Sequence, residues 1–429
     1  MVTVLPLLAM IVALLLGVPI AFALAGAGML GIWLVKGSLY GVLGIVGTAS
    51  YSSAAEYVLT TIPTFVLMAF LSSSGGLASD LFDAASKWLS KLRGGLGIAT
   101  VFACGIFGAM SGASTAAASV MSNVAMPHMR RSGYSEELAS GAIAVGATLD
   151  LLIPPSGIMV IYGIATETSI AKLLIAGVMP GVVLGIFLAL TIIIWVTIRP
   201  SHAPATERVS WPERWRSLFH IWPSLLLIVI VMGLLYSGIA TPTEVGALGA
   251  FMAAAIGVAM KRLTWSGAIE AIKATVRITG MIFLILIGAT IFGYFMTLSQ
   301  MPQLIVAKII EWNVNRYVVI LFIVIAYFII SMFMDELPLL LITLQVTFPL
   351  ITHLGFDPIW YGVLCVLMVS MGLVFPPVGM VAFVVSAAAK VELVKVYKGT
   401  SILVIALIIT TLLVIIFPQI ALWLPSTMR

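Results

Sequence analysis

The chain has 429 residues, of which 62% are hydrophobic and 9% are charged, and its formal net charge is +5. Soluble domains carry charge on about a quarter of their residues, so this composition excludes a soluble globule and indicates a polytopic helical membrane protein. Apolar runs such as residues 403–417 are continuous rather than alternating, which excludes a transmembrane β-barrel.

The basic residues lie beside apolar segments, a pattern that is typical of membrane topology and not of nucleic-acid binding. Cys104 and Cys365 both lie in apolar segments and lack a C-x-x-C spacing. We therefore expect two buried thiols, without a disulfide or a metal site.

Ten full membrane crossings are predicted from apolar runs of about 20 residues. The first half of the chain contains five of them, at residues 2–18, 19–35, 58–79, 137–165 and 173–198. The second half contains the other five, at residues 219–238, 242–260, 278–299, 359–389 and 400–424.

Two further stretches, residues 94–130 and 317–352, have small or acidic residues at their middle. This pattern favours two helical arms that meet at a tip near the midplane of the membrane, which makes each stretch a re-entrant hairpin. A pair of full crossings would have the same length and would fit the flanking charges equally well. Only the chemistry of the tips favours re-entrance.

Flanking charges set the orientation of the chain. Three basic residues precede the first hairpin, and Arg130 and Arg131 follow it, so both ends of this hairpin are expected on the cytoplasmic side. The same rule places the hydrophilic linker 199–218 in the cytoplasm and both termini on the periplasmic side of the inner membrane. A segment at 264–277 is predicted either as an interfacial helix or as an extension of the next crossing.

Two double-proline runs interrupt apolar stretches in the two halves. Pro154-Pro155-Ser156-Gly157 lies in the crossing at 137–165, and Pro376-Pro377-Val378-Gly379 lies in the crossing at 359–389, an offset of 222 residues (376 − 154). Proline lacks a backbone N–H group and clashes with the preceding turn, so each run breaks its helix and frees carbonyl oxygens. Within a membrane such a break is stable only where protein, ions or a cavity cover it.

The same offset relates Pro127 to Pro349 and Gly133 to Gly355. Because the first half starts outside and the second starts inside, the predicted fold is an all-α polytopic membrane protein with two inverted repeats. The repeats comprise residues 1–198 and 219–429. Each contains one hairpin and one broken helix.

The tip of the first hairpin is rich in small and hydroxyl residues, namely Ser111, Gly112, Ser114 and Thr115. Hydroxyl and carbonyl oxygens are hard ligands of the kind that an alkali cation requires. Such residues also occur at tight helix–helix contacts in membranes, and this alternative remains open.

Three acidic residues, Asp150, Asp335 and Glu336, are predicted to lie deep in the membrane. An unpaired charge there costs several kcal/mol, so each is expected to face a polar cavity or a cation. A shift in the predicted register would instead bring one of them to the interface. The broken helices add Pro154, Pro155, Ser156, Gly157, Pro376, Pro377 and Gly379 to the expected site for sodium and substrate.

These residues resemble the large membrane subunit of the tripartite ATP-independent periplasmic (TRAP) transporters, dicarboxylate-type family. The resemblance covers nearly the whole chain. Its most specific matches are Ser111-Gly112-Ala113-Ser114, Met126-Pro127-His128-Met129 with Gly133-Tyr134, Gly146-Ala147-Thr148-Leu149 leading into Leu152-Ile153-Pro154-Pro155-Ser156, Tyr162-Gly163, and Pro376-Pro377-Val378-Gly379.

The resemblance implies a sodium-coupled elevator that imports a small organic acid, with a carboxylate as the expected class. Its implied partners are a small four-helix membrane subunit and an extracytoplasmic solute-binding protein. No cofactor is implied apart from sodium as the coupling ion, which Ser111, Ser114 and Asp335 would hold. The substrate would lie between 111–115 with 154–157 and 334–337 with 376–379.

Three positions depart from the family pattern. The family usually has Gly at Asp150, Thr at Phe375 and Pro at Gln345. The missing hydroxyl at Phe375 removes one expected sodium ligand, and Asp150 adds an anionic one. An anion beside a carboxylate substrate is unfavourable unless a cation lies between them, so Asp150 also bears on substrate class.

Two other functions were weighed. A stand-alone sodium or proton symporter of the same inverted-repeat class would have a similar sequence and would differ in its partners. An intramembrane hydrolase would need a base within reach of Ser111, but His128 is predicted at the membrane surface, far from the tip. We therefore expect a transporter and not an enzyme.

Overall fold

The computed structural model describes residues 4–74, 77–111, 114–204, 209–311 and 314–428, and these residues form helices and connecting turns without strands. The helices of the first half are α1 (Val4–Leu15), α2 (Ile20–Lys36), α3 (Leu39–Ala55), α4 (Thr61–Ser74), α5 (Leu77–Leu89), α6 (Gly95–Ser111), α7 (Ser114–Arg131), α8 (Glu136–Thr148), α9 (Gly157–Thr166) and α10 (Ile170–Ile198). Those of the second half are α11 (Trp211–Ser237), α12 (Pro242–Ala259), α13 (Trp265–Leu298), α14 (Met301–Glu311), α15 (Arg316–Ser331), α16 (Glu336–His353), α17 (Pro358–Gly372), α18 (Met380–Ala389), α19 (Leu393–Ile416) and α20 (Gln419–Ser426). Three 3₁₀ turns are η1 (Tyr57–Thr60), η2 (Leu149–Leu151) and η3 (Pro200–His202).

The prediction of an all-helical polytopic membrane protein is confirmed. Within the described part of the chain, seven helical segments are long and apolar enough to cross a membrane: η1 with α4, α10, α11, α12, α13, α16 and α19. Other predicted crossings are shorter helices or are interrupted, because the double prolines divide α8 from α9 and α17 from α18. The 34 residues of α13 form one continuous helix, so the segment at 264–277 is an extension of a crossing.

Helix boundaries recur at the offset found in the sequence. The helices α7 and α16 begin at Ser114 and Glu336 and end at Arg131 and His353, an offset of 222 residues at both ends (336 − 114 and 353 − 131). The helices α8 and α17 begin at the same offset. Ser135 and Asp357 cap them, each accepting backbone N–H hydrogen bonds of the first turn. The two halves therefore place the same local signals at matching positions.

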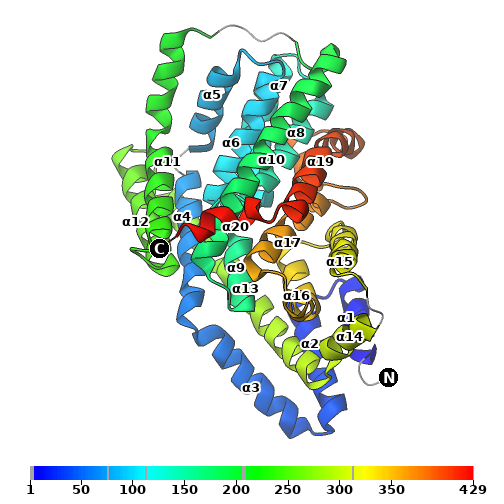
Figure 1. The fold of residues 1–429 in the computed structure, drawn as a ribbon. Helices are drawn as coiled ribbons and strands as arrows, with labels where there is room; N and C mark the ends of the chain where they lie inside the picture. Colours follow the sequence, from blue (N-terminus) through cyan, green and yellow to red (C-terminus); the bar gives the residue numbers. More distant parts are fainter. Residues whose placement is uncertain (1–3, 75–76, 112–113, 205–208, 312–313, 429) are drawn as a thin grey trace.

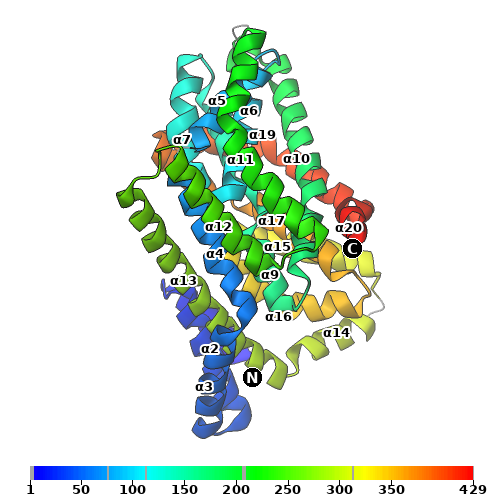
Figure 2. The same ribbon diagram turned by 90° about the vertical axis from the view of Figure 1, so that its left-hand side faces the viewer.

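Both hairpin stretches turn back on themselves. The arms α6 and α7 contact each other, and α15 and α16 do the same. Figure 1 shows α6 and α7 in the upper part of the molecule and α15 and α16 in the lower part, with their tips directed toward the middle. Figure 2 gives the same arrangement from the side, with α4, α12 and α13 running alongside. The tips thus approach each other from opposite ends.

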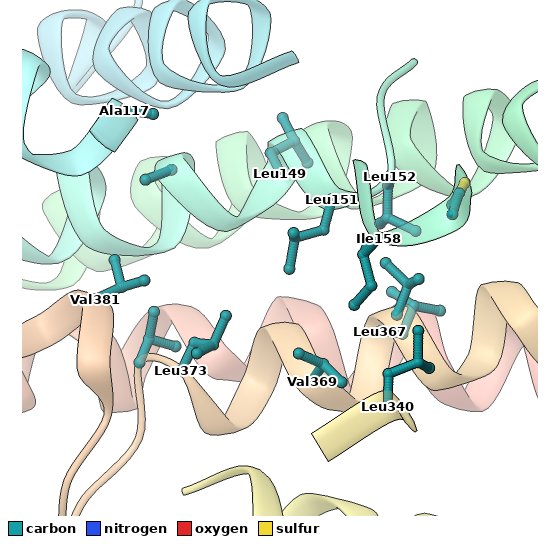
Figure 3. Close-up of a cluster of buried hydrophobic side chains, with 14 of the residues drawn as sticks. Ala117, Leu149, Leu151, Leu152, Ile158, Leu340, Leu367, Val369, Leu373 and Val381 are labelled. Carbon is teal, nitrogen blue, oxygen red and sulfur yellow. The ribbon is translucent and has the colours of Figure 1, made fainter. Parts of the chain in front are cut away.

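A buried apolar cluster surrounds the two helix breaks (Figure 3). Leu149, Leu151 and Leu152 come from the first break, and Leu367 and Val369 come from α17. All five are buried, and the burial of a leucine or valine side chain typically contributes about 1.5–3 kcal/mol. The core of the molecule therefore holds both interrupted helices in one rigid packing unit.

The helices α8 and α19 cross at two glycines. A Cβ atom added to Gly399 would lie 2.0 Å from the carbonyl oxygen of Glu137, and one added to Gly141 would lie 2.7 Å from the carbonyl carbon of Gly399. No side chain fits between these backbones. The glycines therefore let the two halves of the chain approach more closely than larger residues would allow.

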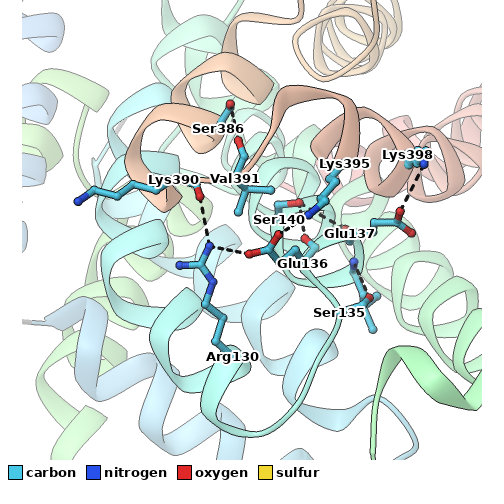
Figure 4. Close-up of polar contacts among 11 residues, drawn as sticks. Arg130, Ser135, Glu136, Glu137, Ser140, Ser386, Lys390, Val391, Lys395 and Lys398 are labelled. Atoms are coloured by element: carbon cyan, nitrogen blue, oxygen red, sulfur yellow. Dashed lines mark hydrogen bonds and ion pairs between the residues drawn. The ribbon is translucent and has the colours of Figure 1, made fainter.

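A charged cluster joins the same helices at one end (Figure 4). Arg130 donates a 2.9 Å hydrogen bond to Glu136, and Lys395 donates one of 3.0 Å to the other oxygen of this carboxylate. Arg130 also donates to the carbonyl oxygen of Lys390 at 3.3 Å. The hydrogen bond from Lys395 lowers the pKa of Glu136, and Arg130 acts in the same direction against partial burial. The cluster connects α7 and α8 to α18 and α19.

Candidate functional site

The first hairpin tip places a hydroxyl in the centre of the molecule. Ser114 begins α7, is 1% exposed, and donates a 2.7 Å hydrogen bond from Oγ to Oδ1 of Asp150. Thr115 follows it and faces a cavity. Gly112 lies outside the described residues, as does the side chain of Ser111, which is the last residue of α6.

Asp150 lies in η2, at the start of the first break, and is 3% exposed. It packs against the first hairpin at Gly108, where an added Cβ atom would lie 2.4 Å from the Cβ of Asp150. The small residues near this tip therefore do more than supply oxygen atoms. At Gly108 the missing side chain leaves the space in which the acidic residue sits.

The first break is partly repaired by its own side chains. Pro154 and Pro155 are buried, and Ser156 Oγ donates to the carbonyl oxygen of Leu151 at 2.6 Å. The helix α9 then begins at Gly157 without a side-chain cap at Ser156. The first backbone N–H groups of a helix lack helical partners, so this terminus can donate to a bound group.

The second hairpin tip contributes two carboxylates. Asp335 caps α16 and accepts a 3.0 Å hydrogen bond from the backbone N–H of Glu336. Glu336 is 9% exposed, and its Oε2 lies 3.4 Å from Ser114 Oγ, within hydrogen-bond distance. Ser114 and Glu336 occupy corresponding positions of the 222-residue offset. The two tips therefore meet through equivalent first residues of α7 and α16.

The second break lies beside the second tip and is closed by protein. The hydroxyl of Tyr397 donates to the carbonyl oxygens of Pro377 and Val378 at 2.9 and 2.8 Å. The backbone N–H of Gly379 donates to the carbonyl oxygen of Met332 at 3.1 Å. The expectation of unpaired carbonyl oxygens is therefore wrong at residues 377 and 378, because a side chain from α19 satisfies them.

A cavity of about 130 Å³ adjoins the first break and both tips. Its polar wall includes Thr115, Asp335 and Glu336, with Pro155 and Gly157 from the first break. The opposite wall comes from α4 and α13, through apolar side chains and Thr61. Pro376, Pro377 and Gly379 are not among its described lining residues. The structure thus gathers the two tips and the first break around one cavity, with the second break behind the second tip.

The sequence gave no signal for two contributors. Thr61 lies in an ordinary apolar crossing, yet its hydroxyl is buried at the cavity wall and has no hydrogen-bond partner among the described residues. Tyr397 lies near a run of lysines and reads as an interfacial residue. Their roles depend on which helices pack together, which no local pattern predicts.

Within the described residues, no three Asp, Glu, His or Cys side chains are placed to hold a metal ion together. A cation at this site would therefore take part of its ligand set from hydroxyl or backbone oxygens. Ser114, Thr115 and the carbonyl groups of the first break are oxygen atoms of this kind.

The chain was then compared with known proteins. The model of the family "Tripartite ATP-independent periplasmic transporter, DctM component" matches residues 7–420. The chain belongs to this family. The family predicted from the sequence motifs is thereby confirmed, and the chain is a multi-pass inner-membrane subunit of a secondary transporter for organic acids, not an enzyme.

Relatives in the DctM family align along most of the chain. The C4-dicarboxylate TRAP transporter large permease protein DctM of Pseudomonas aeruginosa is 35% identical over 377 residues, or 88% of each chain. The ectoine TRAP transporter large permease protein TeaC of Halomonas elongata is 32% identical over 417 residues, or 97% of each chain. A solved structure, the YdaH transporter of Alcanivorax borkumensis, aligns with a TM-score of 0.65 over 90% of each chain at 15% identity, a likeness of fold.

Proposed function

We propose that this chain is the large transmembrane subunit of a sodium-coupled, binding-protein-dependent transporter that imports a small organic acid by an elevator movement. The observation that carries the proposal is the cavity at the meeting point of the two hairpin tips and the first helix break. Groups from both halves of the chain converge there, as expected of a transport site at a repeat interface.

The proposed mobile part comprises the hairpins and broken helices, α6 to α9 and α15 to α18. The proposed scaffold includes α2, α4, α12 and α13, which pack together as the pairs α2 with α13 and α4 with α12. The cavity lies between these parts, because α4 and α13 form one wall and the tips form the other. Sliding the mobile part along this wall would expose the cavity to each side in turn.

Sodium would couple this movement to its own gradient. A cation among Ser114, Asp150 and Glu336 would neutralise carboxylates that are otherwise costly to bury. It would also hold the two tips together, because Ser114 and Glu336 come from different hairpins. Ser111 and Asp335 remain proposed ligands. The proton is the alternative coupling ion, since a protonated carboxyl group would satisfy the same electrostatic demand.

The proposed topology has inverted repeats, with the linker 199–218 in the cytoplasm and both termini in the periplasm. It is supported by the constant helix offset and by hairpin tips that approach from opposite ends. The proposed partners are a small four-helix membrane subunit and an extracytoplasmic solute-binding protein. Relatives of similar length serve C4-dicarboxylate and ectoine systems, which supports delivery of a small carboxylate.

The test is sodium-driven uptake in proteoliposomes that contain the chain with its small subunit and binding protein. The expected result is uptake that requires an inward sodium gradient and all three proteins. We expect Asp335→Asn to weaken the sodium dependence, whereas the control Asp83→Asn, in the exposed part of α5, leaves it unchanged. Uptake by the chain alone would instead support the stand-alone symporter.

A further inference from the structure

The cavity has an unusual balance of charge for a carboxylate transporter. Its charged lining residues are Asp335 and Glu336, and its described lining contains no Lys, Arg or His side chain. A third acid, Asp150, lies behind Ser114 and is also buried. All the charged side chains at this site are therefore acidic.

This balance disfavours a dianion. Two negative charges brought beside two carboxylates repel one another, and the repulsion is stronger in a partly buried site than in water. Binding sites for two carboxylate groups usually supply arginine or another basic partner. A bound sodium ion would offset one charge, but the acidic side chains at the site outnumber it.

An independent observation indicates a polar occupant. Thr61 is 0% exposed, and its hydroxyl has no hydrogen-bond partner among the described residues, although it lies at the cavity wall. Buried polar atoms are normally hydrogen-bonded, so this hydroxyl calls for a partner inside the cavity. It comes from the scaffold wall, opposite the acids, and so would contact a different part of a bound solute.

The size and walls of the cavity limit the solute. Its volume of about 130 Å³ is below the 300–1,000 Å³ that is typical of sites for drug-sized ligands. Apolar side chains such as Ile62, Phe65, Ile158 and Ile282 form much of the remaining wall. The solute should therefore be compact, with an apolar flank between its polar ends.

We infer that this transporter carries a small zwitterionic carboxylate and discriminates against dicarboxylates. The cationic group of the solute would lie at Asp335 and Glu336. Its carboxylate would accept hydrogen bonds from the free N–H groups at the start of α9, where the helix dipole is favourable. This inference rests on the proposed function, because it takes the cavity as the substrate site.

The test measures the charge preference of the cavity without knowledge of the natural solute. In the variant Thr115→Cys, the new thiol faces the cavity, while the native Cys104 and Cys365 are buried. The purified protein is treated with three methanethiosulfonates: a trimethylammonium-ethyl reagent, a sulfonatoethyl reagent and the neutral methyl reagent. Labelling rates are measured by intact-protein mass spectrometry and divided by those at the exposed control site Ser426→Cys.

We expect the normalised rate ratio of cationic to anionic reagent to be on the order of tenfold or more at residue 115. Adding Glu336→Gln should reduce the ratio several-fold, whereas adding Asp83→Asn should leave it unchanged. A ratio of one or less would overturn the inference and leave the cavity standing as a transport site. Failure of even the neutral reagent to label residue 115 would instead contradict the proposed function. A high ratio that Glu336→Gln does not change would overturn the role of Glu336.

Discussion

Ser114 is the residue at which the two hairpins meet. Its single hydroxyl lies 2.7 Å from one oxygen of Asp150 and 3.4 Å from one of Glu336. A hydroxyl has one proton to donate, so it cannot satisfy both carboxylates at full strength. The stronger bond goes to Asp150 within the first half, which leaves Glu336 as the group that gains most from a bound cation.

Replacing this hydroxyl should separate its roles. We expect Ser114→Ala to destabilise the protein by about 1–3 kcal/mol, because a buried carboxylate loses its donor, and to weaken sodium dependence of uptake. Ser114→Thr keeps the hydroxyl and is the matched control. Thermal unfolding in detergent, with and without sodium, measures both effects. Equal behaviour of the alanine and threonine variants would contradict the assignment.

Glu136 predicts a pH dependence outside the membrane. Its pKa is lowered because it accepts a hydrogen bond from Lys395, so its ionised form is favoured in the folded protein. The resulting stability is fully present above the ordinary glutamate value of about 4.3 and is lost as the pH falls through the lowered folded value.

We therefore expect Glu136→Gln to lower the unfolding temperature near neutral pH and to differ little from the wild type at about pH 3. Unfolding scans between these limits measure the difference. The exposed Glu270, on the first turns of α13, gives the control Glu270→Gln, which should lack this trend. A difference that stays constant with pH would rule out the ion cluster as its cause.

At the scale of elements, the two broken helices are alike in sequence and different in use. The first break faces the cavity with a helix N-terminus that no side chain caps. The second break is occupied by Tyr397 and by the tip of its own hairpin. The halves share their helix boundaries, but only one of the two breaks is available to a solute in this conformation.

The crossing of α8 and α19 links these two halves and gives a matched test. Gly399→Ala adds a Cβ atom that would lie 2.0 Å from the backbone oxygen of Glu137, so α19 must move away from α8. We expect a loss of about 1–3 kcal/mol, typical of overpacking. Gly280→Ala adds the same atom in α13, where nothing lies within 4 Å, and should be neutral or slightly stabilising. Similar unfolding temperatures for the two variants would contradict the close crossing.

At the scale of the whole molecule, the proposed elevator requires the tips to move against α4 and α13. The contact between these parts is the cavity itself, and its scaffold side is mostly apolar. An apolar wall forms few directional bonds, so it can slide past the mobile part with little rearrangement. The charged cluster around Glu136 lies within the mobile part and its connection to α19, where it does not oppose this movement.

A reversible cross-link tests the movement. Ile158→Cys on α9 and Ile282→Cys on α13 place thiols on opposite walls of the cavity. A short bifunctional thiosulfonate should stop uptake in the double variant, and a reducing agent should restore it. Either single variant, treated in the same way, should retain most of its activity. Full uptake by the cross-linked double variant would exclude sliding at this wall.

The local pattern of the sequence was enough to predict the helices, the two breaks and the family. Apolar run length, proline and N-cap residues act on their immediate neighbours, and the Pro-Pro-x-Gly runs at 154–157 and 376–379 therefore report their own conformation. The same signals recur at an offset of 222 residues, which is a property of the chain that needs no coordinates. Asp150, Asp335 and Glu336 could be selected as site candidates because buried charge is costly wherever the helix packs.

Packing between distant helices was needed for the rest. The contact of Ser114 with Glu336, the closure of the second break by Tyr397 and the unpaired hydroxyl of Thr61 each join or face elements far apart in the chain. Apolar helices of similar length can pack in many arrangements, and their sequences carry little information about which faces meet. The cavity is therefore a property of the assembled helices, and with it the separation of one break that faces a solute from another that faces protein.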